Sequence, residues 1–256
     1  MTQAESKNSI QVIERMTRLL DALAESPVPA SLKHLAKSAG LHPSTAHRIL
    51  TAMVNGRMVE RAEPGSYRLG MRLIELGNSA KSRLSVRELA LPLMRELHAV
   101  IGEAINLSVR REDEIVYIER TSGGRSMMRV VNVIGGRAPL HITAVGKLFL
   151  LEDGVAGLRA YAQRTGLPGP TRNSLTSIGA LEKELEKARR QGYATDFEEA
   201  ELGVRCIGAG IRDDEGILVA GLSVSAPAER MKQAWYPLVK RTAEDISHGL
   251  GYRASA

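Results

Sequence analysis

The stretch LHPSTAHRILTAMVNG, residues 41–56, carries polar side chains at a spacing that suits contact with a DNA duplex. Its apolar residues recur at the i, i+3, i+4, i+7 spacing of a buried helix face, at Ala46, Ile49, Leu50 and Met53. The remaining face has no acidic residue and presents groups suited to phosphates and base edges, namely Ser44, Thr45, His47, Arg48, Thr51 and Asn55. These residue types predict a recognition helix, against the simpler reading of an ordinary solvated helix face.

The elements before this stretch have the spacing that a recognition helix needs. Pro43 suits the first helical position, where a missing N–H costs nothing. Ser31 can cap a short helix in SLKHLAKSAG that ends at Gly40, and an earlier helix over residues 9–25 stops at the prolines of residues 26–29. A helix, a short turn with glycine and a second helix predict a helix-turn-helix.

A small β-wing is expected after the recognition helix. Val59 lies in one predicted strand and Tyr67 in the next, and Glu63-Pro-Gly-Ser66 forms the turn between them. Arg61 and Arg68 flank this turn, where they can reach flanking phosphates or the minor groove, although surface solubility also explains arginines there. Residues 1–70 are therefore predicted to form a winged helix-turn-helix domain.

A second group of residues could bind a small ligand. Ser223 and Ser225 are two apart in an apolar strand, so both hydroxyls leave the same face. On the partner strand of the expected hairpin, Cys206, Gly208 and Gly210 lack bulk, which would leave room for a ligand with a carboxylate. The alternative is a tightly packed core with serines bonded to backbone, and Asp196, in a polar segment, could simply be solvated.

The order of elements predicts an α+β fold for the second half. Residues 71–85 read as a linker helix, and residues 86–256 as a second domain. Helices are expected over 86–101, 143–151, 155–161, 178–190 and 229–250. Strands are expected over 104–110, 114–119, 127–133, 205–211 and 217–225. Because strands and helices do not alternate regularly, the sheet should be largely antiparallel.

Composition limits the classes of function. The chain has 256 residues and a net charge of +6, which favours an anionic partner without naming one. Its single cysteine, Cys206, excludes an internal disulfide and a cysteine-based zinc site, and the histidines are scattered singly, so neither a metal nor a cofactor is expected. Neither a signal peptide nor an apolar run long enough for a membrane span is visible, so a cytoplasmic location is expected.

The chain resembles the IclR family of bacterial transcriptional regulators over nearly its whole length. The resemblance rests on GLHPSTAHRIL and YRLG in the first half, and on APLHITAVGK, GYATDFEEAELGVRCIGAGI and GLSVSAP in the second. It implies a GAF-like effector domain, a homodimer or dimer of dimers, and operator binding switched by a small organic acid from a catabolic pathway. Repression, activation and a contact with RNA polymerase are all compatible with it.

The same resemblance assigns effector-binding positions. Those carried over are Asp196, Cys206, Ser223, Ser225, the apolar wall residues Met127 and Val130, and Ala144 and Val145. Val145 is bulkier than the family pattern and would reshape the cavity. Two alternatives are a ligand-free domain that only oligomerises and a hydrolase using Cys206, His141 and Asp196, although nothing near Cys206 would lower the pKa of its thiol.

Overall fold

The computed structural model describes residues 3–81, 84–121 and 134–253. The chain forms two compact units, Met1–Arg83 and Leu84–Ala256, so their boundary falls inside the predicted linker at residues 71–85. Met127, Val130 and the strand predicted over 127–133 lie outside the described residues. Each unit has its own hydrophobic core and is described by itself below.

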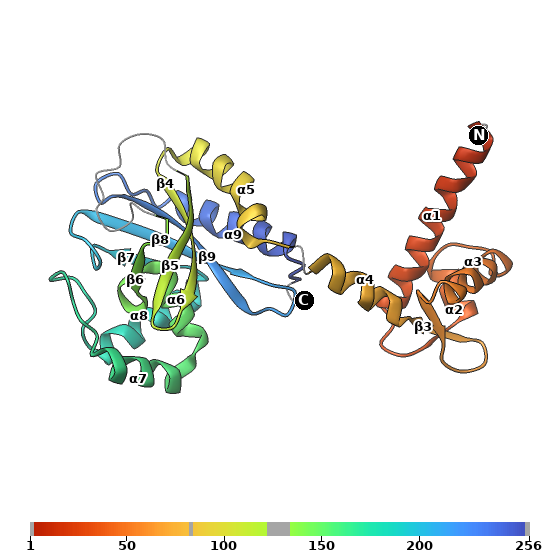
Figure 1. Ribbon diagram of the computed structural model, residues 1–256, viewed down its shortest axis with the longest axis horizontal. Coiled ribbons are helices and arrows are strands. Elements are labelled where there is room, and N and C mark those ends of the chain that lie inside the picture. Colours follow the sequence, from red (N-terminus) through yellow and green to blue (C-terminus); the bar gives the residue numbers. More distant parts are fainter. Residues whose placement is uncertain (1–2, 82–83, 122–133, 254–256) are drawn as a thin grey trace. The chain divides into compact units, whose positions relative to one another are not determined.

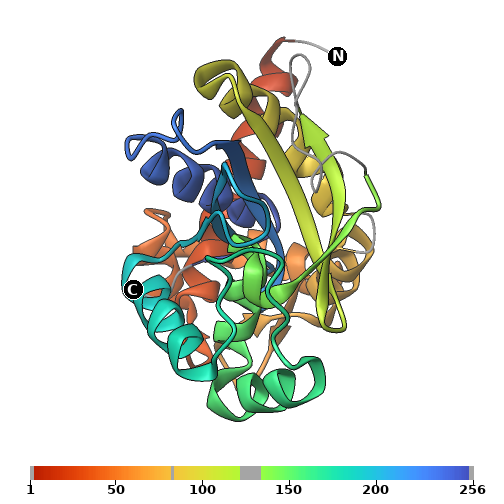
Figure 2. The same cartoon turned by 90° about the vertical axis from the view of Figure 1, so that its left-hand side faces the viewer.

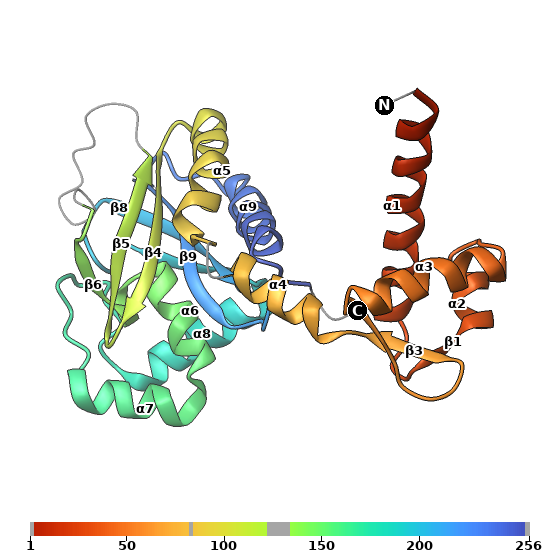
Figure 3. The same ribbon diagram turned by 45° about the vertical axis from the view of Figure 1, so that its right-hand side comes forward.

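The first unit combines helices with a small antiparallel sheet (Figure 3). Its helices are α1 (Gln3–Ala24), α2 (Leu32–Ser38), α3 (Pro43–Asn55) and α4 (Met71–Lys81). The sheet has the order β1-β3-β2, with β1 at Ala30–Ser31, β2 at Val59–Arg61 and β3 at Ser66–Leu69. The core lies between α1, α2 and α3, where Leu19, Leu35 and Leu50 are fully buried.

Local signals in the sequence account for most of this unit. The Ser31 hydroxyl accepts a hydrogen bond from the His34 N–H and caps α2, as predicted. At the tip of the wing the Ser66 N–H donates to the Glu63 carbonyl, and Gly65 has a φ of 81°, which glycine adopts without strain. The short β1 was not predicted, because two residues carry no periodic pattern. The first half is thus a winged helix-turn-helix, as expected.

The second unit is built on a six-stranded antiparallel sheet of order β6-β5-β4-β9-β8-β7 (Figure 1). The strands are β4 (Ala104–Arg111), β5 (Glu114–Thr121), β6 (Arg137–Pro139), β7 (Ala194–Phe197), β8 (Val204–Arg212) and β9 (Leu218–Pro227). The predicted α+β class with a largely antiparallel sheet is confirmed. The short β6 and β7 are additions to the predicted strands.

Helices cover both faces of this sheet (Figures 1 and 2). One face packs on α5 (Val86–Ile101) and α9 (Trp235–Gly249), which lie side by side. The other face packs on α6 (Ala144–Glu152), α7 (Gly154–Thr165) and α8 (Ile178–Gln191), with a short 3₁₀ turn at Leu140–Ile142 before α6. Side chains on strands of this sheet therefore alternate between two interiors.

The closing helix differs from its prediction at one end. It begins at Trp235 rather than Glu229, so the predicted start is wrong. Pro237 has no N–H to donate to the carbonyl of residue 233, and its ring would clash with that carbonyl, so the helix cannot run upstream through Gln233. The preceding residues instead form turns, with the Met231 N–H donating to the Pro227 carbonyl.

Candidate functional site

The outer face of α3 presents most of the polar side chains expected there. Ser44, His47, Arg48 and Asn55 are exposed. Thr45 and Thr51 are half-buried, and the Thr51 Oγ1 is enclosed with no hydrogen-bond partner among the described residues. This enclosed position of the Thr51 hydroxyl differs from the exposed one that the helical pattern predicted.

The two wing arginines differ in their surroundings. Arg61 is exposed at the end of β2. Arg68 lies opposite Glu60 in the β2–β3 ladder and forms an ion pair with it, with an Nη2–Oε2 distance of 3.0 Å. The other oxygen of Glu60 accepts the Met71 N–H at the start of α4. Part of the positive charge of Arg68 is therefore compensated within the wing, whereas that of Arg48 on α3 has no such partner among the described residues.

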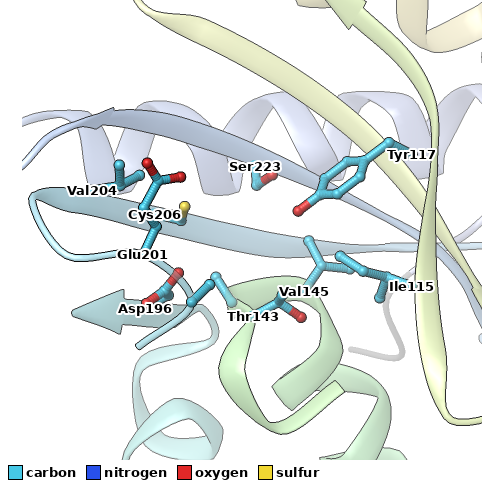
Figure 4. A pocket seen from close by; sticks show the side chains of 11 residues that line it. Ile115, Tyr117, Thr143, Val145, Asp196, Glu201, Val204, Cys206 and Ser223 are labelled. Atoms are coloured by element: carbon cyan, nitrogen blue, oxygen red, sulfur yellow. The ribbon is translucent and has the colours of Figure 1, made fainter. Parts of the chain in front are cut away.

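A small cavity lies in the second unit between the sheet and the start of α6 (Figure 4). Its volume is about 20 Å³. The walls come from β5, the turn before α6, β7, β8 and β9, and the lining residues are Ile115, Tyr117, Thr143, Ala144, Val145, Asp196, Ala200, Glu201, Val204, Cys206 and Ser223. This cavity is the place where most of the predicted effector residues meet.

Five predicted effector residues line the cavity: Ala144, Val145, Asp196, Cys206 and Ser223. Ser225 lies beside it, fully buried, with its Oγ 3.2 Å from the Cys206 Sγ. The ladder explains the grouping, because Asp196 pairs with Cys206 and Cys206 pairs with Ser225. The sequence reasoning missed Tyr117 on β5, although its alternation with Ile115 placed both on one face of a predicted strand.

The glycines on β8 and β9 do not provide room for a ligand. A Cβ on Gly208 would lie 3.0 Å from the Val145 backbone nitrogen, and one on Gly210 would lie 2.5 Å from Leu218 Cδ1. A Cβ on Gly221 would overlap the side chain of Val145. The prediction that Gly208 and Gly210 leave space for a ligand is therefore wrong, because they allow α6 and Leu218 to pack closely on the sheet.

Hydrogen-bond donors converge on this cavity. Thr143 caps α6 by accepting the Gly146 N–H, so the first N–H groups of the helix face outward beside the cavity-lining residues Ala144 and Val145. The hydroxyls of Ser223 and Tyr117 have no hydrogen-bond partner among the described residues, and both point into the cavity (Figure 4). Burial raises the pKa of Tyr117, which keeps its hydroxyl protonated as a donor.

The two ionisable groups at the other end of the cavity favour their neutral forms. Burial, and then the nearby Glu199 carboxylate, raise the pKa of Asp196 to about 7. Burial, and then the charge of Asp196, raise the pKa of the Cys206 thiol well above its ordinary value. A protonated Asp196 and a neutral thiol would not repel an anion, whereas a charged Asp196 would.

A buried ion pair holds the segment that carries Asp196. Lys147 on α6 is fully buried, and its Nζ donates to Glu199 Oε1 at 2.5 Å and to the Thr195 carbonyl at 2.7 Å. The Glu199 N–H in turn donates to Asp196 Oδ1 at 2.7 Å. The charge of Lys147 is thereby committed to Glu199, and the position of Asp196 is tied to α6.

The hydrolase alternative fails on geometry. The two ring nitrogens of His141 lie 2.7 Å from the Tyr161 hydroxyl and 3.0 Å from the Pro168 carbonyl, so both are occupied by groups other than Cys206. Burial lowers the pKa of His141 and raises that of Cys206, which disfavours the charged pair that a cysteine nucleophile needs. Within the described ranges, no group of three His, Cys, Asp or Glu residues could hold a metal ion.

Comparison with known proteins decides the family. Residues 78–248 match the model of the C-terminal domain of the bacterial transcriptional regulator IclR, and residues 12–63 match the IclR helix-turn-helix domain. The chain belongs to the IclR family. The resemblance drawn from the sequence motifs is therefore confirmed.

Relatives from this family match almost the whole chain. An uncharacterised HTH-type transcriptional regulator of Haemophilus influenzae is 35% identical over 250 residues, which are 94% of this chain and 93% of that protein. The repressor BlcR of Agobacterium tumefaciens is 28% identical, with a TM-score of 0.87 over 96% of this chain and 100% of its own. An IclR homologue of Microbacterium hydrocarbonoxydans, solved in complex with 4-hydroxybenzoate, is 28% identical, with a TM-score of 0.60 over 93% of this chain and 98% of its own.

Membership of the IclR family fixes the coarse function. The protein is a DNA-binding transcriptional regulator and not an enzyme. Among the described residues, no helix is both long enough and apolar enough to cross a membrane.

Proposed function

We propose that this regulator senses a small carboxylic acid in the cavity between the sheet and α6, and that binding changes its affinity for an operator in a catabolic operon. The observation that carries the proposal is the convergence of unpaired donors, from Ser223, Tyr117 and the start of α6, on one cavity. A helix N-terminus and neutral hydroxyls stabilise an anion without a positively charged side chain. The relative bound to 4-hydroxybenzoate supports an organic acid as the ligand class.

The size of the cavity supports a regulatory role. About 20 Å³ is room for one water molecule, and an organic acid needs several times more. An effector therefore binds only when Val145, Tyr117 or their neighbours move apart. A ligand that favours an open arrangement of this unit shifts its population, which is how a binding event becomes a signal.

On the DNA side, we propose that exposed residues of α3 contact the operator, namely Ser44, His47, Arg48 and Asn55. Arg61 would contact neighbouring phosphates, and Thr45 and Arg68 would lie at the edge of the DNA interface. The exposed face of α3 supports this assignment. Two copies, as a homodimer or a dimer of dimers, would present paired recognition helices to two half-sites. Repression is the sign we favour, because the similar BlcR is a repressor.

The test is thermal denaturation of the full-length protein with 4-hydroxybenzoate, benzoate, pyruvate and gluconate. An acid present at a hundred times its Kd should stabilise the fold by about 2.7 kcal/mol. Ser223→Ala should reduce this stabilisation, and Ser38→Ala, on the exposed surface of the first unit, should keep it. If Ser223→Ala responds to the acids as the parent does, the pocket assignment is wrong.

A second experiment links the pocket to DNA. The acid that stabilises the protein is added to an operator complex in a mobility-shift assay, and we expect it to release the DNA. An acid that binds but leaves the complex intact would contradict the proposal that binding weakens operator affinity.

A further inference from the structure

Two fully buried polar side chains beside the effector cavity have atoms without hydrogen-bond partners. They are Asn106 and Ser108 on β4, and the unpaired atoms are Asn106 Oδ1 and Ser108 Oγ. Burying a polar atom without a partner is energetically costly, so such atoms are rare in folded proteins and call for an explanation. The fold itself provides no partner for them among the described residues.

Both lie on the sheet face that borders the effector cavity, outside its present lining. In the sheet, β4 lies between β5, which carries Tyr117, and β9, which carries Ser223. Asn106 pairs directly with Ser223, and Ser108 pairs with Tyr117, so all four side chains leave the same face. Figure 4 shows Tyr117 reaching from β5 toward Ser223, and this path crosses β4. Asn106 and Ser108 are therefore the direct ladder neighbours of two lining residues, next to a cavity whose walls must already open for a ligand.

The orientation of the Asn106 amide defines what it can bind. Its Nδ2 donates to the Ser225 Oγ at 3.1 Å, and that oxygen also contacts the Cys206 thiol. The amide nitrogen is thus held by the sheet, while the carbonyl oxygen is left as an acceptor. An acceptor needs a donor from the ligand, and a hydroxyl group is one.

We propose that Asn106 is a specificity-determining residue, which accepts a hydrogen bond from an effector hydroxyl while Ser108 pairs with the same group, so that the effector is a hydroxy acid. The inference rests on the proposed function, because it requires a carboxylate held at the start of α6. The carboxylate end of the ligand is then bound at the start of α6, and the hydroxyl end is bound by β4. The Tyr117 ring moves aside when the ligand enters.

The test compares matched acids with and without a hydroxyl, 4-hydroxybenzoate against benzoate and lactate against propionate, by calorimetric titration. For at least one pair, the wild-type protein should bind the hydroxylated acid about tenfold or more tightly than the acid without a hydroxyl. An acid without the hydroxyl leaves the Asn106 carbonyl oxygen without a hydrogen-bond donor. Asn106→Leu should bind both members of that pair equally. Ser223→Ala should weaken both members alike, and Asn173→Ala, a surface asparagine of the same unit, should keep the preference.

The outcomes separate this inference from the proposed function. If acids bind and the wild-type protein shows no preference, or if Asn106→Leu retains it, Asn106 is not a specificity residue, although the pocket still stands. If none of the four acids binds at millimolar concentration, both ideas fail. Should Asn106→Leu not fold, Asn106→Ser removes the same acceptor with less added bulk, and retention of the preference in that variant overturns the inference equally.

Discussion

Asp196 is the residue whose chemistry is most altered by the fold. It is 2% exposed, and its carboxyl group lies between the Cys206 thiol and the Glu199 backbone. Lys147 is near enough to lower the pKa of Asp196 but is committed to Glu199, so burial prevails and the value rises to about 7. Asp196 is thus a buried carboxyl group whose pKa lies near 7 in the wall of the cavity.

The raised pKa of Asp196 makes the protein less stable toward unfolding as the pH rises. The pKa of Asp196 is 3.8 when unperturbed and about 7 in the folded protein, so the folded state resists ionisation. Stability from this group is present in full below about pH 4 and is lost as the pH rises toward 7, by on the order of 4 kcal/mol. Asp196→Asn should remove this dependence and stabilise the protein above pH 7. Urea denaturation between pH 4 and 8 measures it, and parallel curves for variant and parent would contradict the assignment.

The Lys147–Glu199 pair should reveal itself through non-additive substitutions. Lys147→Met leaves a carboxylate 5% exposed with no cation, which should cost about 3–5 kcal/mol of unfolding free energy. Lys147→Met with Glu199→Met removes both charges and should recover much of that loss. Chemical denaturation of the two single variants and the double variant measures the coupling. Equal and additive losses would show that the two charges do not stabilise each other.

Sequence alone identified part of the pocket, and the missing part has a physical reason. Asp196, Cys206 and Ser223 were found through motif resemblance and the period of two in a strand. Asn106 was not found, because its position next to the cavity depends on the sheet order that places β4 between β5 and β9, and its hydrogen-bond partner Ser225 is 119 residues away in sequence. The burial of the Thr51 hydroxyl was missed because helical periodicity predicts only which face of the helix a residue lies on. It does not predict whether the hydroxyl of a residue at the border between the buried and exposed faces is enclosed.

At the scale of elements, the close approach of α6 to the sheet decides the shape of the pocket. Gly208 and Gly221 lack the Cβ atoms that would hold the helix away, and Val145 fills the space over Gly221. The bulk of Val145 is thus matched by a glycine across the interface. This compensation could not be read from either strand or helix alone, since it joins positions far apart in the chain.

Gly221→Ala tests this packing directly. The new methyl group would overlap Val145, so we expect a loss of about 1–3 kcal/mol of stability from overpacking. Adding Val145→Ala should relieve the overlap and restore part of the loss. Thermal or urea denaturation of both single variants and the double variant provides the comparison. If Gly221→Ala is as stable as the parent, α6 can move away from the sheet at little cost in free energy, and the cavity walls are less rigid than this packing implies.

The recognition helix offers a matched pair of substitutions. Arg48→Ala removes an exposed cation from α3 and should weaken operator binding by about 1–3 kcal/mol if the side chain reads a base. Thr51→Val replaces an enclosed, unpaired hydroxyl with a methyl group of similar size, so it should leave DNA binding unchanged and the fold at least as stable. Fluorescence anisotropy with an operator duplex measures both. A loss of binding in Thr51→Val would show that this hydroxyl turns outward on DNA.

At the scale of the whole molecule, ligand binding in one unit must be thermodynamically coupled to DNA binding in the other if the protein is a sensor. The pocket lies wholly in the second unit and the recognition helix wholly in the first, joined in sequence through residues 82–85. A ligand confined to one unit changes DNA affinity only if it prefers the arrangement that DNA disfavours, or the reverse. The coupling free energy between the two sites is therefore the quantity that defines the regulator.

That coupling is reciprocal, which gives a prediction with no free parameter. If the bound acid weakens operator affinity by a given factor, saturating operator DNA must weaken affinity for the acid by the same factor, typically about 5- to 150-fold. Titrating the acid with and without the duplex, at one fixed salt concentration because phosphate contacts make DNA affinity salt-dependent, measures one side of the cycle. Arg48→Ala, at concentrations where it no longer binds the duplex, should bind the acid equally in both conditions. If DNA leaves the affinity of the parent protein for the acid unchanged, the pocket is not coupled to the recognition helix. The regulatory proposal then fails, even if the acid binds in the pocket.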